Sequence, residues 1–221
     1  MSGNSRDQNP YDSTTTSDYR KEVAPGDAAS GHVAPPPGEF LGHPSSLWML
    51  FSTEFWERFC YYGMRAILAV YVAETFFGDL TKEEAKTQAS LTYGGYTSLV
   101  YATGMLGGFI ADRLLGYQRS ILLGGLLMAL GMFTLLIDNL FAFLIGLSII
   151  VVGNGLFKPN ISSMVGKLYA PGDARRDSGF TIFYMGINLG AFFAPIVCAS
   201  WIGAQFGLKY GFLAAGLGMI L

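Results

Sequence analysis

Long apolar stretches separated by short polar connectors make up the chain from about residue 46 to its end. A helix needs about 20 mostly apolar residues to cross the hydrocarbon core of a membrane. The pattern therefore predicts spanning helices at residues 46–76, 87–114, 118–138, 141–168, 178–202 and 208–221. The last stretch has roughly half the length that a crossing requires, so we expect the sixth helix to be truncated.

The first 44 residues differ in composition, because they are rich in Ser, Thr, Asp, Gly and Pro. They lack the apolar core of a cleavable signal peptide. We therefore predict a disordered tail over residues 1–44, which includes both histidines, His32 and His43. Residues 45–221 are predicted to form an all-α, polytopic bundle in the lipid bilayer.

The charges in the connectors predict how this bundle is oriented. Basic residues gather in the connectors near residues 112–119 and 167–176, whereas the connector near residues 79–84 is acidic. Because basic connectors stay in the cytoplasm, the N-terminus is predicted to be cytoplasmic.

Composition argues against several other classes of protein. The chain is 51% hydrophobic and 14% charged, with a net charge of −2, which predicts no nucleic-acid surface. Cys60 and Cys198 both lie in apolar stretches, where a thiol usually packs as a small apolar group. The connectors contain no nucleophile–base pair and no phosphate-binding loop. We therefore expect that the protein is not an enzyme and that it binds no cofactor and no metal.

The first predicted helix carries acidic and basic residues at bilayer depth, where each lone charge costs several kcal/mol. At about 100° per residue, one face of this helix collects Glu54, Glu57, Arg58, Tyr61, Tyr62 and Arg65. Such a face can line a cavity. Arg58 follows Glu54 by four residues and is adjacent to Glu57, so we expect an acid–base cluster. The alternative is a static buried ion network, which would be a weak source of stability.

The fourth predicted helix adds a cation, Lys158, well inside its span and directly before Pro159. This proline removes a backbone hydrogen bond and loosens the helix. A cation at this depth needs an acidic partner, which Glu54, Glu57 or an acid outside this chain could supply.

Glycines and further tyrosines in the spans are predicted to pack rather than to bind ligands. Small residues let helices approach closely, which is the role expected for Gly94, Gly95, Gly104, Gly107 and Gly108. The same packing role is expected for Tyr71, Tyr93 and Tyr96.

Several motifs resemble one family of membrane proteins. The segment EFWERFCYYG at residues 54–63 resembles the first-helix signature of the proton-dependent oligopeptide transporters, a family of the major facilitator superfamily. The segments FKPN at 157–160 and FYMGINLG at 183–190 are similar to two further elements of that family. The segment at 108–116 resembles the superfamily's loop between the second and third helices. Gly94 stands where animal members carry a histidine, which points to a bacterial member.

The resemblance implies an N-terminal six-helix bundle made of two inverted three-helix repeats, with a C-terminal half outside this chain. It implies a symporter that imports di- and tripeptides with protons by alternating access, in the inner membrane. The residues implied in proton coupling are Glu54, Glu57, Arg58 and Lys158. Those implied in substrate binding are Tyr61, Tyr62, Arg65, Tyr101, Tyr184 and Asn188. Those implied in the loop motif are Asp112, Arg113 and Gly116.

The residue types suit a peptide, because a zwitterion with a backbone amide needs a cation for its carboxylate, polar groups for its backbone and aromatic walls. Arg65 and Lys158 fit the first requirement, although Arg65 could instead pair with an acid of the C-terminal half. Two other functions remain open, namely a proton-coupled transporter of nitrate or another small anion with the same fold, and a membrane sensor or scaffold that does not transport.

Overall fold

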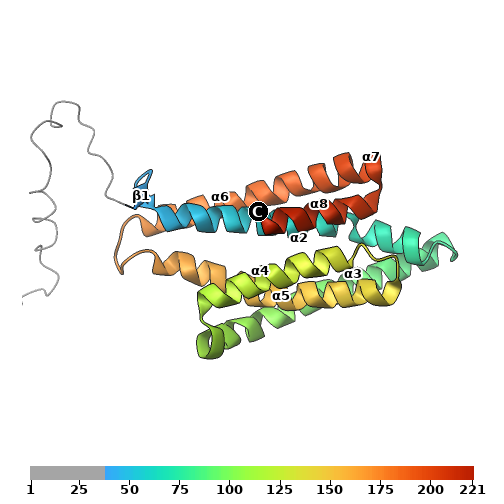
Figure 1. Ribbon diagram of the computed structural model, residues 1–221, viewed down its shortest axis with the longest axis horizontal. Helices are drawn as coiled ribbons and strands as arrows, with labels where there is room; N and C mark the ends of the chain where they lie inside the picture. The colour runs from blue at the N-terminus through green and yellow to red at the C-terminus, as the bar shows by residue number, and fades with distance from the viewer. Residues whose placement is uncertain (1–37) are drawn as a thin grey trace, which may run out of the picture. The chain divides into compact units, whose positions relative to one another are not determined.

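The computed structural model describes residues 38–221 (Figure 1). Most of the predicted disordered tail therefore lies outside the described residues, as does His32. The chain divides into two units, Met1–Gly42 and His43–Leu221. The described part of the first unit holds the short strand β1 (Glu39–Phe40).

The second unit starts with the short strand β2 (His43–Pro44) and is otherwise helical, which confirms the predicted all-α fold. Its helices are α2 (Ser45–Phe76), α3 (Lys82–Ile110), α4 (Tyr117–Thr134), α5 (Leu140–Lys167), α6 (Arg176–Ala194), α7 (Ala204–Phe206) and α8 (Leu208–Ile220). Two π-helical segments extend them, η1 (Ala111–Leu115) after α3 and η2 (Pro195–Gly203) after α6.

The long helices run side by side in two layers within this unit (Figure 1). Helix α2 packs against α6 and α8, while α5 packs against α3 and α4. Contacts of α2 with α3 and of α4 with α8 join the layers. Among the described helices, Leu140–Lys167 and Arg176–Phe206 are long and apolar enough to cross a membrane on length and composition alone.

Local chemistry explains where the helices depart from the predicted ranges. Helix α3 begins five residues before position 87, because Thr81 forms a capping box in which its hydroxyl accepts from the Glu84 amide and the Glu84 carboxylate accepts from the Thr81 amide. Hydropathy does not register this polar first turn. Pro195 interrupts the predicted span at 178–202, since proline has no N–H for the helical ladder and the chain widens into η2.

Close packing of α4 on α5 depends on facing glycines. A Cβ atom at Gly124 would lie 2.6 Å from the Gly153 carbonyl oxygen, and one at Gly131 would lie 2.8 Å from the Gly146 carbonyl oxygen. Both distances are too short for a side chain, so glycine at these positions lets the two backbones meet.

The glycines of α3 behave unequally. A Cβ atom at Gly107 would overlap the Gly155 carbonyl of α5, which is the carbonyl that Pro159 leaves without a helical donor. At Gly108 the nearest atom would be the Pro159 Cβ, at 3.8 Å. No atom of the described residues lies within 4 Å of a Cβ built at three others, Gly94, Gly95 and Gly104. The described residues thus give those three no close packing partner, and their packing role stays a prediction.

The connector between α4 and α5 is tied to two helices. Asp138 accepts a hydrogen bond from Lys209 at 2.5 Å and another from the Tyr71 hydroxyl at 3.1 Å. These bonds, the one from Lys209 first, lower the pKa of Asp138 below its usual value. Tyr71 also stacks on Phe143 at 5.5 Å between ring centroids, in agreement with its predicted packing role.

His43 marks a difference from the predicted tail. Its side chain is buried, and its Nδ1 atom lies 2.8 Å from the hydroxyl of Tyr169, which follows α5. The second unit thus begins at His43, before the predicted boundary at residue 45. Composition did not predict this, because the contact of His43 with Tyr169 joins residues that are far apart in the sequence.

Candidate functional site

The charged face of α2 forms the predicted cluster. Arg58 Nε lies 3.1 Å from Glu54 Oε1 and also donates a hydrogen bond to Glu57 Oε2. All three residues are buried, with exposed fractions of 3% for Glu54, 0% for Glu57 and 4% for Arg58. Three ionisable groups are therefore withdrawn from solvent, an arrangement that is costly for their charged forms unless hydrogen bonds satisfy them.

Neighbouring helices enclose this cluster. Helix α6 approaches α2 so closely that a Cβ atom at Gly190 would lie 3.0 Å from the Arg58 Cβ. From α5, the buried side-chain amide of Asn154 donates a hydrogen bond to Glu57 Oε1 at 3.0 Å. Asn154 was not among the predicted site residues, although an amide in an apolar stretch, one turn before Lys158, is a signal in the sequence.

Pairing within the cluster is incomplete. Glu54 Oε2 and Arg58 Nη2 are buried and have no hydrogen-bond partner among the described residues. Two carboxylates and one guanidinium also leave one negative charge without a matching cation. The cluster can therefore take up a further positive charge or a proton.

Lys158 provides a positive charge close to the cluster. It interacts electrostatically with both Glu54 and Glu57, yet its ammonium forms no ion pair within 4 Å among the described residues. The side chain is exposed on α5, and its Nζ atom lies 5.4 Å from the ring centroid of Tyr101. The predicted residues Lys158 and Tyr101 are thus brought together.

A second group surrounds Arg65 on α2. Its Nε atom donates to the Tyr93 hydroxyl at 2.8 Å, and its Nη1 atom donates to the Tyr61 hydroxyl at 3.4 Å. Its guanidinium also lies 6.0 Å from the Tyr62 ring centroid. Tyr93 was predicted to pack, and it does pack against the core, but its hydroxyl also holds Arg65, a contact that the packing prediction did not include. No carboxylate of the described residues pairs with this guanidinium.

Tyr61 connects the two groups. The guanidinium carbons of Arg58 and Arg65 each lie 5.3 Å from the centroid of its ring. Because an aromatic face attracts cations, this ring separates the arginines and stabilises both. A continuous polar and aromatic face therefore runs along α2.

The two predicted residues on α6 stand apart from these groups. Tyr184 and Asn188 are exposed, and the Asn188 amide donates to the Tyr184 carbonyl at 2.9 Å. Among the described residues, neither side chain forms a hydrogen bond or an ion pair with the α2 cluster.

The loop motif after α3 is built from local contacts. The Tyr117 hydroxyl donates to Asp112 at 2.7 Å, and the Arg113 guanidinium lies 5.2 Å from the ring centroid of Phe109. Gly116 has a φ of 77°, a left-handed conformation that glycine adopts at little cost. This glycine turns the chain from η1 into α4.

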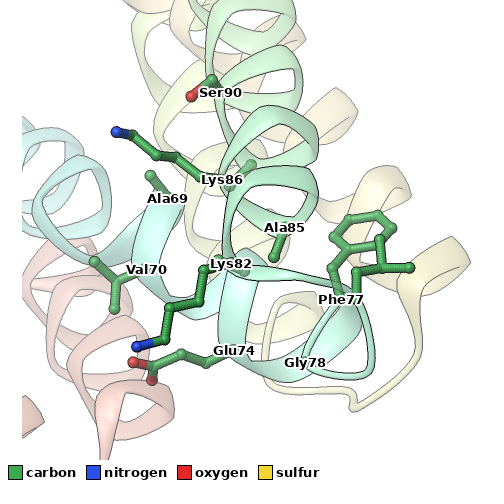
Figure 2. A pocket seen from close by; sticks show the side chains of 12 residues that line it. Ala69, Val70, Glu74, Phe77, Gly78, Lys82, Ala85, Lys86 and Ser90 are labelled. Atoms are coloured by element: carbon green, nitrogen blue, oxygen red, sulfur yellow. The ribbon is translucent and has the colours of Figure 1, made fainter.

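A cavity of about 540 Å³ lies between α2 and α3 (Figure 2). Its walls are mainly apolar, with Glu74, Lys82 and Lys86 as the charged residues that line it. Figure 2 shows Glu74 and Lys82 extending toward the same corner. None of the predicted site residues lines this cavity, which begins one helical turn beyond Arg65 at Ala69. Among the described residues, no group of three or more His, Cys, Asp or Glu side chains is placed to hold a metal ion.

Comparisons with known proteins agree with this architecture. The chain is 47% identical to the uncharacterized transporter YclF of Bacillus subtilis and 46% identical to a di-/tripeptide transporter of Lactococcus lactis. Each match covers 82% of this chain and 37% of the relative. The chain thus spans little more than a third of the length of these curated relatives.

This chain is also similar to a solved structure. A crystal structure of a peptide transporter, POT, in complex with sulfate matches with a TM-score of 0.76 and 47% identity, over 82% of this chain and 37% of that one. The model of the POT family matches residues 118–221. The buried cluster of α2, the helical architecture and these similarities lead to one conclusion: the chain belongs to the POT family, a family of membrane transporters.

Proposed function

We propose that this chain is the N-terminal half of a proton-coupled symporter that imports di- and tripeptides. The observation that carries the proposal is the buried cluster of Glu54, Glu57 and Arg58, which is short of one positive charge. Intramembrane ionisable residues of this kind mark ion and substrate pathways more often than they stabilise a fold. The similarity to a di-/tripeptide transporter supports the choice of substrate.

In this proposal, the proton and Lys158 compete for the surplus negative charge. When the cluster is deprotonated, Lys158 moves into an ion pair with it. When a proton binds, Lys158 is released from the cluster and can meet the carboxylate of a peptide. The paired and released positions of Lys158 thereby couple proton binding to the conformation of the transporter.

Arg65 is proposed to bind the substrate carboxylate. Its partners Tyr93 and Tyr61 are neutral hydroxyl groups, which orient the guanidinium without neutralising it. Tyr62, Tyr101, Tyr184 and Asn188 are proposed as further contacts, and the C-terminal half would complete the site. The protein is proposed to lie in the inner membrane with its N-terminus in the cytoplasm, because the basic connectors and the loop motif then face the same side.

Uptake into proteoliposomes tests this function. The protein that contains this chain together with a C-terminal half should accumulate labelled dialanine when the lumen is more alkaline than the medium, and a protonophore should abolish this accumulation. Unlabelled dialanine should compete, whereas nitrate should not. Uptake of nitrate without uptake of dialanine would support the small-anion alternative, and binding of dialanine without any uptake would support a sensor.

A further inference from the structure

The two glutamates of the α2 cluster are hydrogen-bonded unequally. Both oxygens of Glu57 accept from fixed donors, Oε1 from Asn154 and Oε2 from Arg58. Glu54 has only its Oε1 atom near Arg58, at 3.1 Å. Its Oε2 atom is buried and has no partner among the described residues. One carboxylate therefore has a donor on each oxygen, and the other has an oxygen without a donor among the described residues.

Hydrogen bonds to the charged form of a carboxylate favour that form, and removing a donor from a buried anion is costly. Adding a proton to Glu57 would weaken the bond from either Asn154 or Arg58, because a neutral carboxyl group is a poorer acceptor than a carboxylate. Adding a proton to Glu54 Oε2 weakens no hydrogen bond at that atom, because it accepts none among the described residues.

We propose that Asn154 is a positioning residue that favours the ionised form of Glu57 and thereby directs the exchangeable proton to Glu54. This inference rests on the proposed proton coupling and assigns its two carboxylates different tasks. Glu57 keeps Arg58 in place, and Glu54 gains and loses the proton.

The surroundings of Glu57 support a special role for Asn154. The described groups that interact electrostatically with this carboxylate are Glu54, Arg58, Cys60, Tyr96 and Lys158. Asn154 differs from all of them because an amide does not titrate. Its hold on Glu57 is therefore independent of pH and of the position of Lys158, which lies one turn further along α5.

Four variants test the inference in the protein that contains this chain with its C-terminal half. Asn154→Ala removes the donor, Asn154→Asp replaces it with an acid of the same size, and Asn154→Thr keeps a hydroxyl donor. Asn160→Ala is the matched control, because Asn160 is equally buried on α5 but, within residues 38–221, donates only to the backbone carbonyls of Leu156 and Gly107. The readout is dialanine uptake into proteoliposomes as a function of external pH.

Without its donor, Glu57 should compete for the proton, so the pH of half-maximal uptake should rise by about one unit in Asn154→Ala. Asn154→Asp should shift it in the same direction, because a second acid beside Glu57 favours protonation of the pair. Asn154→Thr should restore the original value, and Asn160→Ala should leave it unchanged.

Two results would overturn the inference while leaving the proposed function intact. One is proton-driven uptake with the original pH dependence in both Asn154→Ala and Asn154→Asp. The other is an equal shift in Asn160→Ala, which would show that any buried amide of α5 has this effect. If uptake by the unsubstituted protein does not depend on the proton gradient, the proposed function itself is refuted.

Discussion

Single residues of the site show what sequence spacing can and cannot predict. Glu54, Glu57 and Arg58 lie on one helix, so the helical repeat alone was enough to predict that they meet. Asn154 and Tyr93 belong to other helices, and their bonds to this face depend on how the helices pack. Spacing along the chain holds no information about such contacts, and these two residues were therefore missed.

The Tyr93 hydroxyl gives a test at this scale. Tyr93→Phe should raise the KM for dialanine by about 3- to 10-fold with little change in kcat, because Arg65 loses the acceptor that orients it. Tyr96→Phe on the same helix is the control, since the Tyr96 hydroxyl is buried and has no partner among the described residues. Kinetics of uptake by the two purified variants provide the measurement, and equal KM values for both would argue against a positioning role for Tyr93.

At the scale of helices, hydropathy predicted where the apolar segments lie but not how they end or pack. The capping box at Thr81 and the widening at Pro195 are set by hydrogen bonds and by a missing N–H, which an apolar average does not record. The glycines of α3 look alike in the sequence, although only Gly107 faces a backbone that excludes a side chain. Which face of a helix is covered depends on its neighbours.

Gly107 and Gly104 form a matched pair for testing the packing of α3 on α5. Gly107→Ala should destabilise the protein by about 1–3 kcal/mol, because the new methyl group overlaps the Gly155 carbonyl. Gly104→Ala should be neutral or slightly stabilising, since alanine favours a helix and nothing described lies within 4 Å. Thermal unfolding in detergent measures both, and an equal effect of the two substitutions would contradict this packing.

For the whole molecule, the sequence predicted the all-α fold and the family, because a long apolar pattern and several ordered motifs each point the same way. The described residues supply one face of the proposed cavity. The chain spans 37% of the length of its curated relatives, so acids that pair with Arg65 or Lys158 in another state are proposed to come from the C-terminal half. Contacts of that kind cannot be predicted from the sequence of one half.

Glu54, within the cluster of α2, is proposed to couple protons to transport. Glu54→Gln keeps the size of the side chain but cannot carry an exchangeable proton. In proteoliposomes this variant should lose gradient-driven accumulation of dialanine while it still exchanges labelled for unlabelled dialanine across the membrane, because exchange needs no net proton movement. Accumulation by Glu54→Gln with normal pH dependence would contradict the account.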